Sequence, residues 1–338
     1  MIGAGSWGTA LTARLSANGH RVTIWSVSQR EVDLLNTEHE QKEKLPGVIL
    51  PDSMLATTDL KTAVRDKDLL VMAVPSMFTR STAAQLKEAL REVCPEGKLP
   101  PIVSAAKGLE ENTLMTLTQI IEDEIPGIRT VVLFGPTHAE EVGIGLPTAI
   151  VAGSTRREDA LLVQDIFMSP EFRVYTSPDP LGMQIGAALK NVIALAAGVA
   201  DGLGYGDNTK AALITRGIAE ITRLGEAMGG RSETFAGLTG IGDLIVTCAS
   251  MHSRNRRAGI LIGQGRTPEE AMKEVNQVVE GVFCAKAARQ LSEKLQTEAP
   301  IVEQVCRVLF EGASAAEAVR ELMQRDKKFE NPSALWPE

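Results

Sequence analysis

The sequence is poor in cysteine, in histidine and in basic charge, and each shortage excludes a class of protein. Its four cysteines and four histidines show no CxxC pair and no metal-ligand spacing. We therefore predict reduced thiols and no metal site, rather than a disulfide framework or a zinc centre. Acidic residues outnumber basic ones, 43 to 35, so no nucleic-acid partner is expected. The histidines are interpreted as surface or loop residues: His20, His39, His138 and His252.

Long hydrophobic runs are also missing. No stretch reaches the roughly 18 apolar residues that cross a bilayer, and the N-terminus has no charged-then-apolar leader. These absences predict a cytoplasmic protein without membrane insertion. At 338 residues, the chain exceeds the size at which one hydrophobic core usually stops growing, so two domains are expected.

The first half alternates strand-like and helix-like segments, which is typical of an α/β parallel sheet. The predicted strands are 21–26, 68–74, 102–106, 130–134 and 148–152. The predicted helices between them are 9–17, 29–36, 81–93 and 113–124.

The second half reads differently from about Pro180 onward. Residues 181–203 are apolar on nearly every face, as in a fully buried helix, and further helical segments follow without β-branched runs. The predicted helices are 210–228, 232–235, 243–248, 255–264, 268–276, 284–295 and 314–325. The fold class is therefore α/β, with an N-terminal Rossmann-like doubly wound sheet (1–179), an all-helical C-terminal domain (180–326) and a flexible tail (327–338).

A glycine motif, Gly3-Ala4-Gly5-Ser6-Trp7-Gly8, precedes the first predicted helix. Glycines at these spacings allow a tight turn, a close approach of pyrophosphate and close packing of helix on strand. The helix start adds free N–H groups and a positive dipole end. Gly3, Gly5, Ser6, Trp7 and Gly8 are therefore predicted to bind a dinucleotide.

The strand that should precede this motif consists only of Met1 and Ile2. So short a central strand would leave ladder groups of its neighbours unpaired, which is costly in a buried sheet. We therefore expect that the native start lies upstream and that several strand residues are missing.

The end of the second predicted strand bears on the choice between NAD and NADP. NAD-selective sites often place an acid there, to accept from the ribose hydroxyls. Here residues 25–28 contain none, and Arg30 follows shortly after. This pattern favours NADP if Arg30 pairs with a 2′-phosphate; Arg30 could equally be a solvated helix residue.

Several motifs along the chain resemble the bacterial NAD(P)-dependent glycerol-3-phosphate dehydrogenases. In order they are GAGSWG (3–8), AKGLE (106–110), GPTHA (135–139), LKN (189–191), GIGDL (240–244), SRNRR (253–257) and VVEG (278–281). The resemblance extends to about residue 325 and implies interconversion of dihydroxyacetone phosphate and sn-glycerol 3-phosphate by hydride transfer. It also implies a homodimer that supplies glycerophospholipid synthesis.

Two lysines are candidate catalytic residues. Lys190 lies inside an apolar segment, where burial lowers the pKa of an ammonium group towards the range useful for proton transfer; the alternative is a side chain that reaches solvent from a core helix. The resemblance makes Lys190 the proton acceptor and a substrate ligand. Lys107 follows a predicted strand, where ligand groups collect in open sheets, and the resemblance assigns it contacts with substrate and cofactor.

Asp243 follows a glycine-rich turn before an apolar helix. It is a natural helix-start carboxylate, and the resemblance makes it a catalytic residue that contacts substrate and holds Lys190. After the strand 130–134, the resemblance places Gly135 and Thr137 on the substrate and Ala139 on the cofactor. Thr137 replaces a serine frequent in the family and keeps the hydroxyl.

The basic cluster that an acidic protein needs for an anionic ligand is Ser253–Arg257. A serine at a helix start followed by arginine is a natural phosphate site. The resemblance assigns Ser253, Arg254 and Asn255 to the substrate phosphate. It assigns Arg254, Val278 and Glu280 to the cofactor. Related hydroxyacid dehydrogenases and a non-catalytic dinucleotide sensor are the alternative functions.

Overall fold

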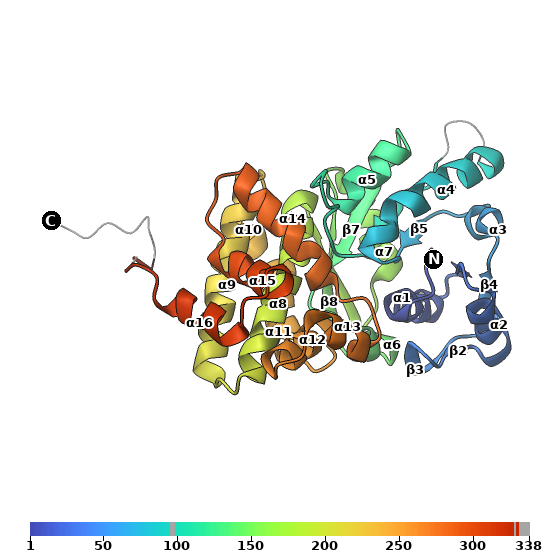
Figure 1. Ribbon diagram of the computed structural model, residues 1–338. Coiled ribbons are helices and arrows are strands. Elements are labelled where there is room, and N and C mark those ends of the chain that lie inside the picture. The colour runs from blue at the N-terminus through green and yellow to red at the C-terminus, as the bar shows by residue number, and fades with distance from the viewer. Residues whose placement is uncertain (95–98, 328, 331–338) are drawn as a thin grey trace.

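The computed structural model describes residues 1–94, 99–327 and 329–330. A sheet-containing half and a helical half lie side by side in it (Figure 1). The sheet-containing half is formed by the residues up to the end of β9 (Ser177), and the helical half is formed by the helices from Pro180 onward. Most of the tail predicted at 327–338 lies outside the described residues.

The main sheet runs in the order β4-β1, then Ile2, then β5-β6-β7-β8-β9. Its outer pair departs from the predicted all-parallel arrangement, because β8 is antiparallel to β7 while β9 is parallel to β8. The strands are β1 Thr23–Trp25, β4 Leu55–Thr57, β5 Leu70–Met72, β6 Ile102–Ser104, β7 Thr130–Phe134, β8 Thr148–Gly153 and β9 Phe172–Ser177. A hairpin outside this sheet pairs β2 Glu40–Gln41 with β3 Leu45–Ile49.

Ile2 joins the two parts of the sheet, since it forms parallel bridges with Trp25 on one side and Met72 on the other. Its N–H donates to the Val71 carbonyl (2.7 Å), and its own carbonyl accepts from Ala73 (2.8 Å). The Met1 ammonium donates to the Thr23 carbonyl (2.7 Å), and burial lowers its pKa to about 5. These bonds place Gly3 at the carboxyl end of the parallel strands.

Helices cover both faces of the sheet, because successive strand residues point to opposite sides. Val71 and Val103 pack in a cluster with residues of α1, α2 and α7, whereas Leu70 and Ile102 pack with residues of α3, α4 and α5. The doubly wound arrangement is thus confirmed. The helices are α1 Ser6–Ala17, α2 Gln29–Glu38, α3 Leu60–Val64, α4 Thr79–Val93, α5 Leu117–Glu124, α6 Ala139–Gly143 and α7 Arg157–Phe167.

Several predicted boundaries in this half differ from the structure, and the start of α5 differs most. The helix expected from residue 113 begins at Leu117 instead, because Thr116 and Gln119 form a reciprocal capping box at its start. Just before it, Asn112 and Leu114 adopt positive φ angles of 73° and 60°, which no α-helix contains. Strands β2, β3, β4 and β9 and helices α3, α6 and α7 were not predicted.

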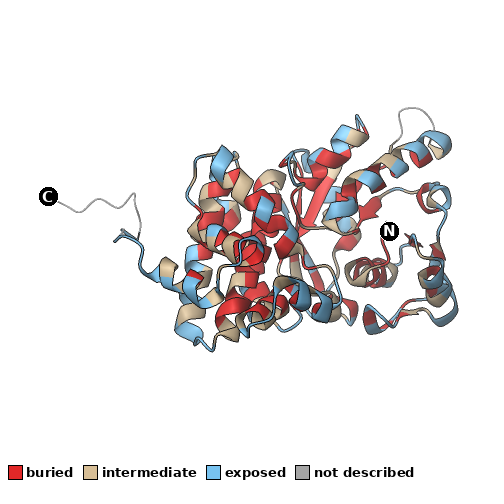
Figure 2. Ribbon diagram, in the orientation of Figure 1, coloured by how far each residue is buried: buried red, intermediate tan, exposed pale blue. Residues whose placement is uncertain are grey.

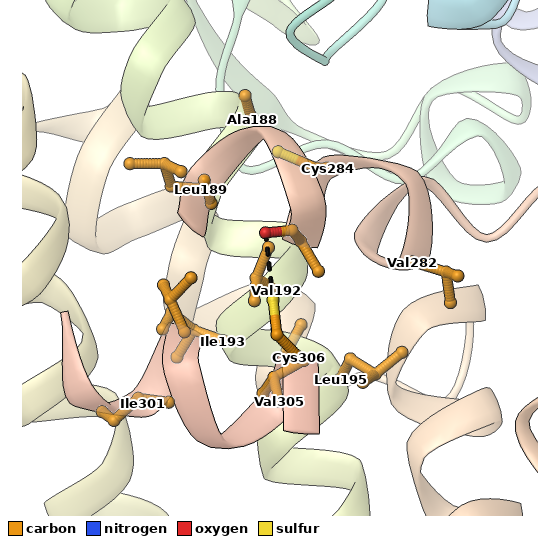
Figure 3. Packing of buried hydrophobic residues seen from close by; sticks show 14 of the residues in the cluster. Ala188, Leu189, Val192, Ile193, Leu195, Val282, Cys284, Ile301, Val305 and Cys306 are labelled. Atoms are coloured by element: carbon orange, nitrogen blue, oxygen red, sulfur yellow. Dashed lines mark hydrogen bonds between the residues drawn. The ribbon is translucent and has the colours of Figure 1, made fainter. Parts of the chain in front are cut away.

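The helical half packs around α8 (Pro180–Gly202). Its core joins α8 to α14 and α15, and the Cys306 thiol donates to the Ala285 carbonyl (3.2 Å) (Figure 3). The four cysteines are free, as predicted. The remaining helices are α9 Asp207–Ala227, α10 Ser232–Phe235, α11 Asp243–Ala249, α12 Arg254–Gly263, α13 Pro268–Val275, α14 Glu280–Lys294, α15 Pro300–Phe310 and α16 Ala315–Met323; α15 was not predicted.

Helix α8 is long and apolar enough to cross a bilayer, although polar residues such as Gln184 and Lys190 interrupt its apolar run. However, 94% of its most apolar window is buried inside the protein. Figure 2 shows this helix and the central strands of the sheet largely as buried, with exposed residues on the outer helices, the β2–β3 hairpin and the loops. Its composition is therefore that of a core helix, and the adjoining helices cover it on nearly all sides.

Candidate active site

A cavity of about 640 Å³ lies between the two halves and collects most of the predicted site residues. Three others, Gly8, Gly135 and Asp243, lie behind the residues that form its described lining. The predicted residues that line it are Gly3, Gly5, Ser6, Trp7, Lys107, Thr137, Ala139, Lys190, Ser253, Arg254, Asn255, Val278 and Glu280.

The glycine turn has the shape that a pyrophosphate requires. Gly3 has φ +114°, and a Cβ there would lie 2.9 Å from the Ala73 carbonyl oxygen, while a Cβ on Gly8 would lie 2.1 Å from that of Gly3. Gly5, by contrast, has open space around its Cβ position. It is also the N-cap of α1, without any side-chain cap among the described residues. Backbone N–H groups thus face an open cradle, which fits a dinucleotide phosphate.

A lysine–carboxylate–lysine cluster lies at the inner wall of the cavity. The two carboxylate oxygens of Asp243 accept from Lys190 Nζ (2.7 Å) and from Lys107 Nζ (2.6 Å). Lys190 also donates to the Thr247 hydroxyl (2.6 Å), and Lys107 donates to the Gly135 carbonyl (3.3 Å). Asp243 is fully buried, so it holds both ammonium groups without itself reaching the cavity.

The electrostatics of this cluster follow from its burial. Burial lowers the pKa of Lys190 to about 8, Lys107 adds repulsion, and the attraction of Asp243 opposes both. Burial opposes ionisation of Asp243, but the two lysines outweigh it and hold the pKa of the carboxyl below its usual value. Lys190 is thus an ammonium group able to give up and regain a proton near neutral pH.

Close packing of α8 on α12 brings the basic cluster to Lys190. Added Cβ atoms on Gly198 and Gly259 would each lie 2.1 Å from a backbone carbonyl oxygen of the opposing helix. Beyond this contact, Asn255 donates to the Asn191 side chain (3.0 Å) and accepts from the Gly281 N–H (2.8 Å). The small residues let the helices approach, and the asparagines fix their register.

The start of α12 presents the predicted phosphate site. Ser253 is the N-cap, and its hydroxyl accepts from Arg256 N–H (3.2 Å). Arg254 is the first residue of the helix and is exposed on the cavity. Arg256 is largely buried and pairs with Asp201 (2.7 Å), so it supports the α8–α12 contact rather than the phosphate site.

Glu280 connects the two halves across the cavity. Its carboxylate accepts from the backbone N–H (3.1 Å) and the hydroxyl (2.5 Å) of Ser76, 204 residues earlier in the chain. Val278 lines the same wall. On the opposite side, Ala139 begins α6, and the Thr137 hydroxyl donates to the Gly135 carbonyl (3.2 Å).

The end of β1 differs from its prediction. Arg30 is 82% exposed and pairs with Glu43, and it is not part of the described cavity wall, so its interpretation as a solvated residue is confirmed. An acid does line the cavity here, but it is Glu31, in the first turn of α2. Because Glu31 lies in the helix after residues 25–28, the sequence pattern at the strand end did not identify it.

Several cavity residues were not predicted. Thr247 follows Asp243 by one helical turn, a spacing that could have identified it. His138 and His252, interpreted as plain surface or loop residues, both line the cavity with ring centroids 5.7 Å apart. Burial lowers the pKa of His138, and the Lys190 ammonium adds to this effect.

A Rossmann-type dinucleotide-binding half joined to a helical half, with two lysines held by one buried carboxylate between them, defines a two-domain dehydrogenase architecture. Two family models match the chain: the NAD-dependent glycerol-3-phosphate dehydrogenase N-terminus over residues 1–160 and its C-terminus over residues 179–320. The chain belongs to this family of oxidoreductases.

Individual proteins agree with this assignment. The chain is 59% identical over 336 residues (99% of this chain, 98% of the relative) to the glycerol-3-phosphate dehydrogenase [NAD(P)+] of Agathobacter rectalis. It is 58% identical to that of Fusobacterium nucleatum (98% and 97% covered). The crystal structure of glycerol-3-phosphate dehydrogenase from Coxiella burnetii is similar, with TM-score 0.91 and 34% identity over 96% of this chain and 98% of that one.

Proposed function

We propose that the protein interconverts dihydroxyacetone phosphate and sn-glycerol 3-phosphate, with Lys190 as the group that gives and takes the proton. The observation that carries this proposal is the Lys190–Asp243–Lys107 cluster, which shares one cavity with the glycine turn and Arg254. When bound, the dinucleotide supplies the hydride for reduction of the C2 ketone and accepts it in the reverse direction.

The residues of the chain perform the remaining steps. Below its pKa of about 8, Lys190 is an ammonium group that can donate a proton to the developing alkoxide at C2. Asp243 keeps this group charged and oriented, and Lys107, whose amine is held by the same carboxylate, faces the substrate as a second cation. Electrostatic stabilisation of the negative charge that develops on the C2 oxygen lowers the barrier far more in a water-poor cavity than it would in bulk water.

The phosphate of the substrate would be bound at the start of α12. Arg254 offers a planar fork matched to phosphate, and the N–H groups next to Ser253 and Asn255 add to it. Binding energy at this remote group orients the reacting carbon. Gly135 and Thr137 complete the substrate side, while Gly3–Gly8, Lys107, Ala139, Val278 and Glu280 form the dinucleotide side.

Further aspects of the proposal follow from family membership and from the charges at the end of β1. We propose that the protein accepts a 2′-phosphate, with Lys44 rather than Arg30 as the cation that faces it, because Lys44 lines the cavity and its charge balances that of Glu31 beside it. We also propose cytoplasmic action as a homodimer that supplies glycerophospholipid synthesis. Residues 1–179 and 180–326 would act as the cofactor and substrate domains.

The decisive experiment compares oxidation of NADPH and NADH by the purified protein in the presence of dihydroxyacetone phosphate and of 3-hydroxyacid-derived ketones. Turnover with the phosphorylated triose alone supports the proposal. Turnover only with the ketoacids would reassign the protein to the hydroxyacid dehydrogenases. Tight dinucleotide binding without turnover of any substrate would instead indicate a sensor.

A further inference from the structure

The cavity wall contains a half-buried imidazole that the mechanism does not use. His138 lines the cavity and lies directly between Thr137 and Ala139 in the chain. Its Nε2 atom is buried and has no hydrogen-bond partner among the residues that the structure describes. Because buried polar atoms are nearly always paired, a polar group of a bound ligand is a natural partner for this nitrogen.

The ring lies between the two parts of the proposed substrate site. On one side, the Lys190 and Lys107 ammonium groups are near enough to act on the charge of His138. On the other side, the ring of His252, the residue that precedes the helix cap Ser253, lies with its centroid 5.7 Å away. A three-carbon ligand that reaches from the lysines to the start of α12 therefore passes beside His138.

The charge state of the ring decides which ligand group it can bind. Burial lowers the pKa of His138, and the Lys190 ammonium lowers it further, whereas Glu140 and the backbone of Val246 act in the opposite direction and are outweighed. The ring is therefore predominantly neutral at pH 7. A nitrogen of a neutral imidazole either donates or accepts, and a hydroxyl group does both. Nε2 can thus pair with a hydroxyl in either tautomer.

We propose that His138 is a substrate-binding residue whose imidazole forms a hydrogen bond with the C1 hydroxyl of the triose. The inference rests on the proposed reaction, in which Arg254 binds the phosphate and Lys190 serves the oxygen on C2. The C1 hydroxyl is the remaining oxygen of dihydroxyacetone phosphate. The side chain is only half-buried, and the terminal torsion of histidine is broad and roughly two-fold, so the ring can turn to meet it. His138 thereby favours a ketone with a hydroxyl group at C1 over one with a methyl group.

Hydroxyacetone phosphate, which has a methyl group in place of the C1 hydroxyl, is the matched probe. His138→Phe keeps an aromatic ring but removes both nitrogens. In this variant kcat/KM for dihydroxyacetone phosphate should fall by about tenfold, while that for hydroxyacetone phosphate should stay within about twofold of native. His138→Gln supplies an amide that can donate or accept, so the native preference should return to within about threefold. His20→Phe is the control, because His20 is exposed and is not among the described cavity residues.

The measurement is kcat/KM of each full-length variant for the two ketones at saturating NAD(P)H, expressed as their ratio. A ratio that falls about tenfold in His138→Phe, recovers in His138→Gln and is unchanged in His20→Phe supports the inference. A ratio within about twofold of native in His138→Phe overturns it, because a merely structural histidine would affect both ketones alike. His138→Leu, with a smaller side chain, repeats the comparison if phenylalanine prevents folding. Native protein that reduces neither ketone refutes the proposed reaction and this contact together, so the two kinds of failure are distinguishable.

Discussion

Replacement of Asp243 by asparagine would remove the carboxylate that contacts both Lys190 and Lys107 while preserving the shape of the side chain. In the native protein its oxygens lie 2.7 Å from Lys190 Nζ and 2.6 Å from Lys107 Nζ, and the residue is fully buried. An opposite charge this close typically changes the pKa of its partner by about 1–3. Without it, burial and the Lys107 charge both act against the Lys190 ammonium.

The direction of the effect is defined by the native pKa of Lys190, about 8. Reduction of the ketone needs the ammonium form, so the native rate should fall as pH rises through about 8, whereas oxidation of the alcohol should rise there. In Asp243→Asn the alkaline limb of the reduction profile should move down to roughly pH 5–7. At neutral pH the variant then lacks its proton donor, and kcat should fall by about 10²–10⁴.

The assay is the steady-state rate of NAD(P)H oxidation with saturating dihydroxyacetone phosphate on both sides of neutrality. Removing one partner of a buried ion pair costs on the order of 3–5 kcal/mol, so urea unfolding must establish that the variant is folded. Asp123→Asn is the matched control, because its carboxylate pairs with Arg80 at the surface and is 52% exposed. A folded Asp243→Asn protein whose alkaline limb stays near pH 8 would refute this account of the cluster.

Three further substitutions test other parts of the site. Lys190→Ala should abolish turnover while the dissociation constant of the dinucleotide, measured by fluorescence, changes by less than about twofold; near-native kcat would exclude Lys190 as the proton-transferring group. Arg254→Met should raise KM for dihydroxyacetone phosphate by about 10–100-fold but leave that for unphosphorylated dihydroxyacetone unchanged, and an equal effect on both ketones would argue against a phosphate contact. Gly259→Ala places a Cβ where the Leu195 carbonyl oxygen would lie 2.1 Å away, so the free energy of unfolding in urea should fall by about 1–3 kcal/mol; an unchanged midpoint would mean that α8 and α12 can separate without cost.

Local signals in the sequence were sufficient for the fold class and for the elements with strong periodicity. The strand 130–134 and the start of the long core helix near residue 180 agree with the structure to within a residue. Prediction failed for short elements whose own residues give only a weak signal for helix or strand. Short elements such as β9 and α3 are stabilised mainly by the sheet and helices around them, which no window of sequence contains.

The candidate site shows the same division. The glycine turn and the capped start of α12 could be recognised because each lies within one short segment. The bond between Lys190 and Asp243, 53 residues apart, was anticipated only through resemblance to the family, and the bond between Lys107 and Asp243, 136 residues apart, was not predicted. Glu31 and Lys44 escaped recognition because, in the sequence, each looks like an ordinary surface charge.

The sequence by itself determined where the strongly periodic helices and the central strands form, that the segment after about Pro180 must be buried, and that a lysine would lie among apolar neighbours. These properties depend on side-chain periodicity and turn chemistry over a few residues. Only the tertiary structure decided which charged side chains contact one another. It brings the Asp243 carboxylate into contact with two lysines, and it places Lys44, rather than Arg30, on the cavity wall. Electrostatic partners are chosen by distance in space, and chain folding sets that distance independently of separation along the sequence.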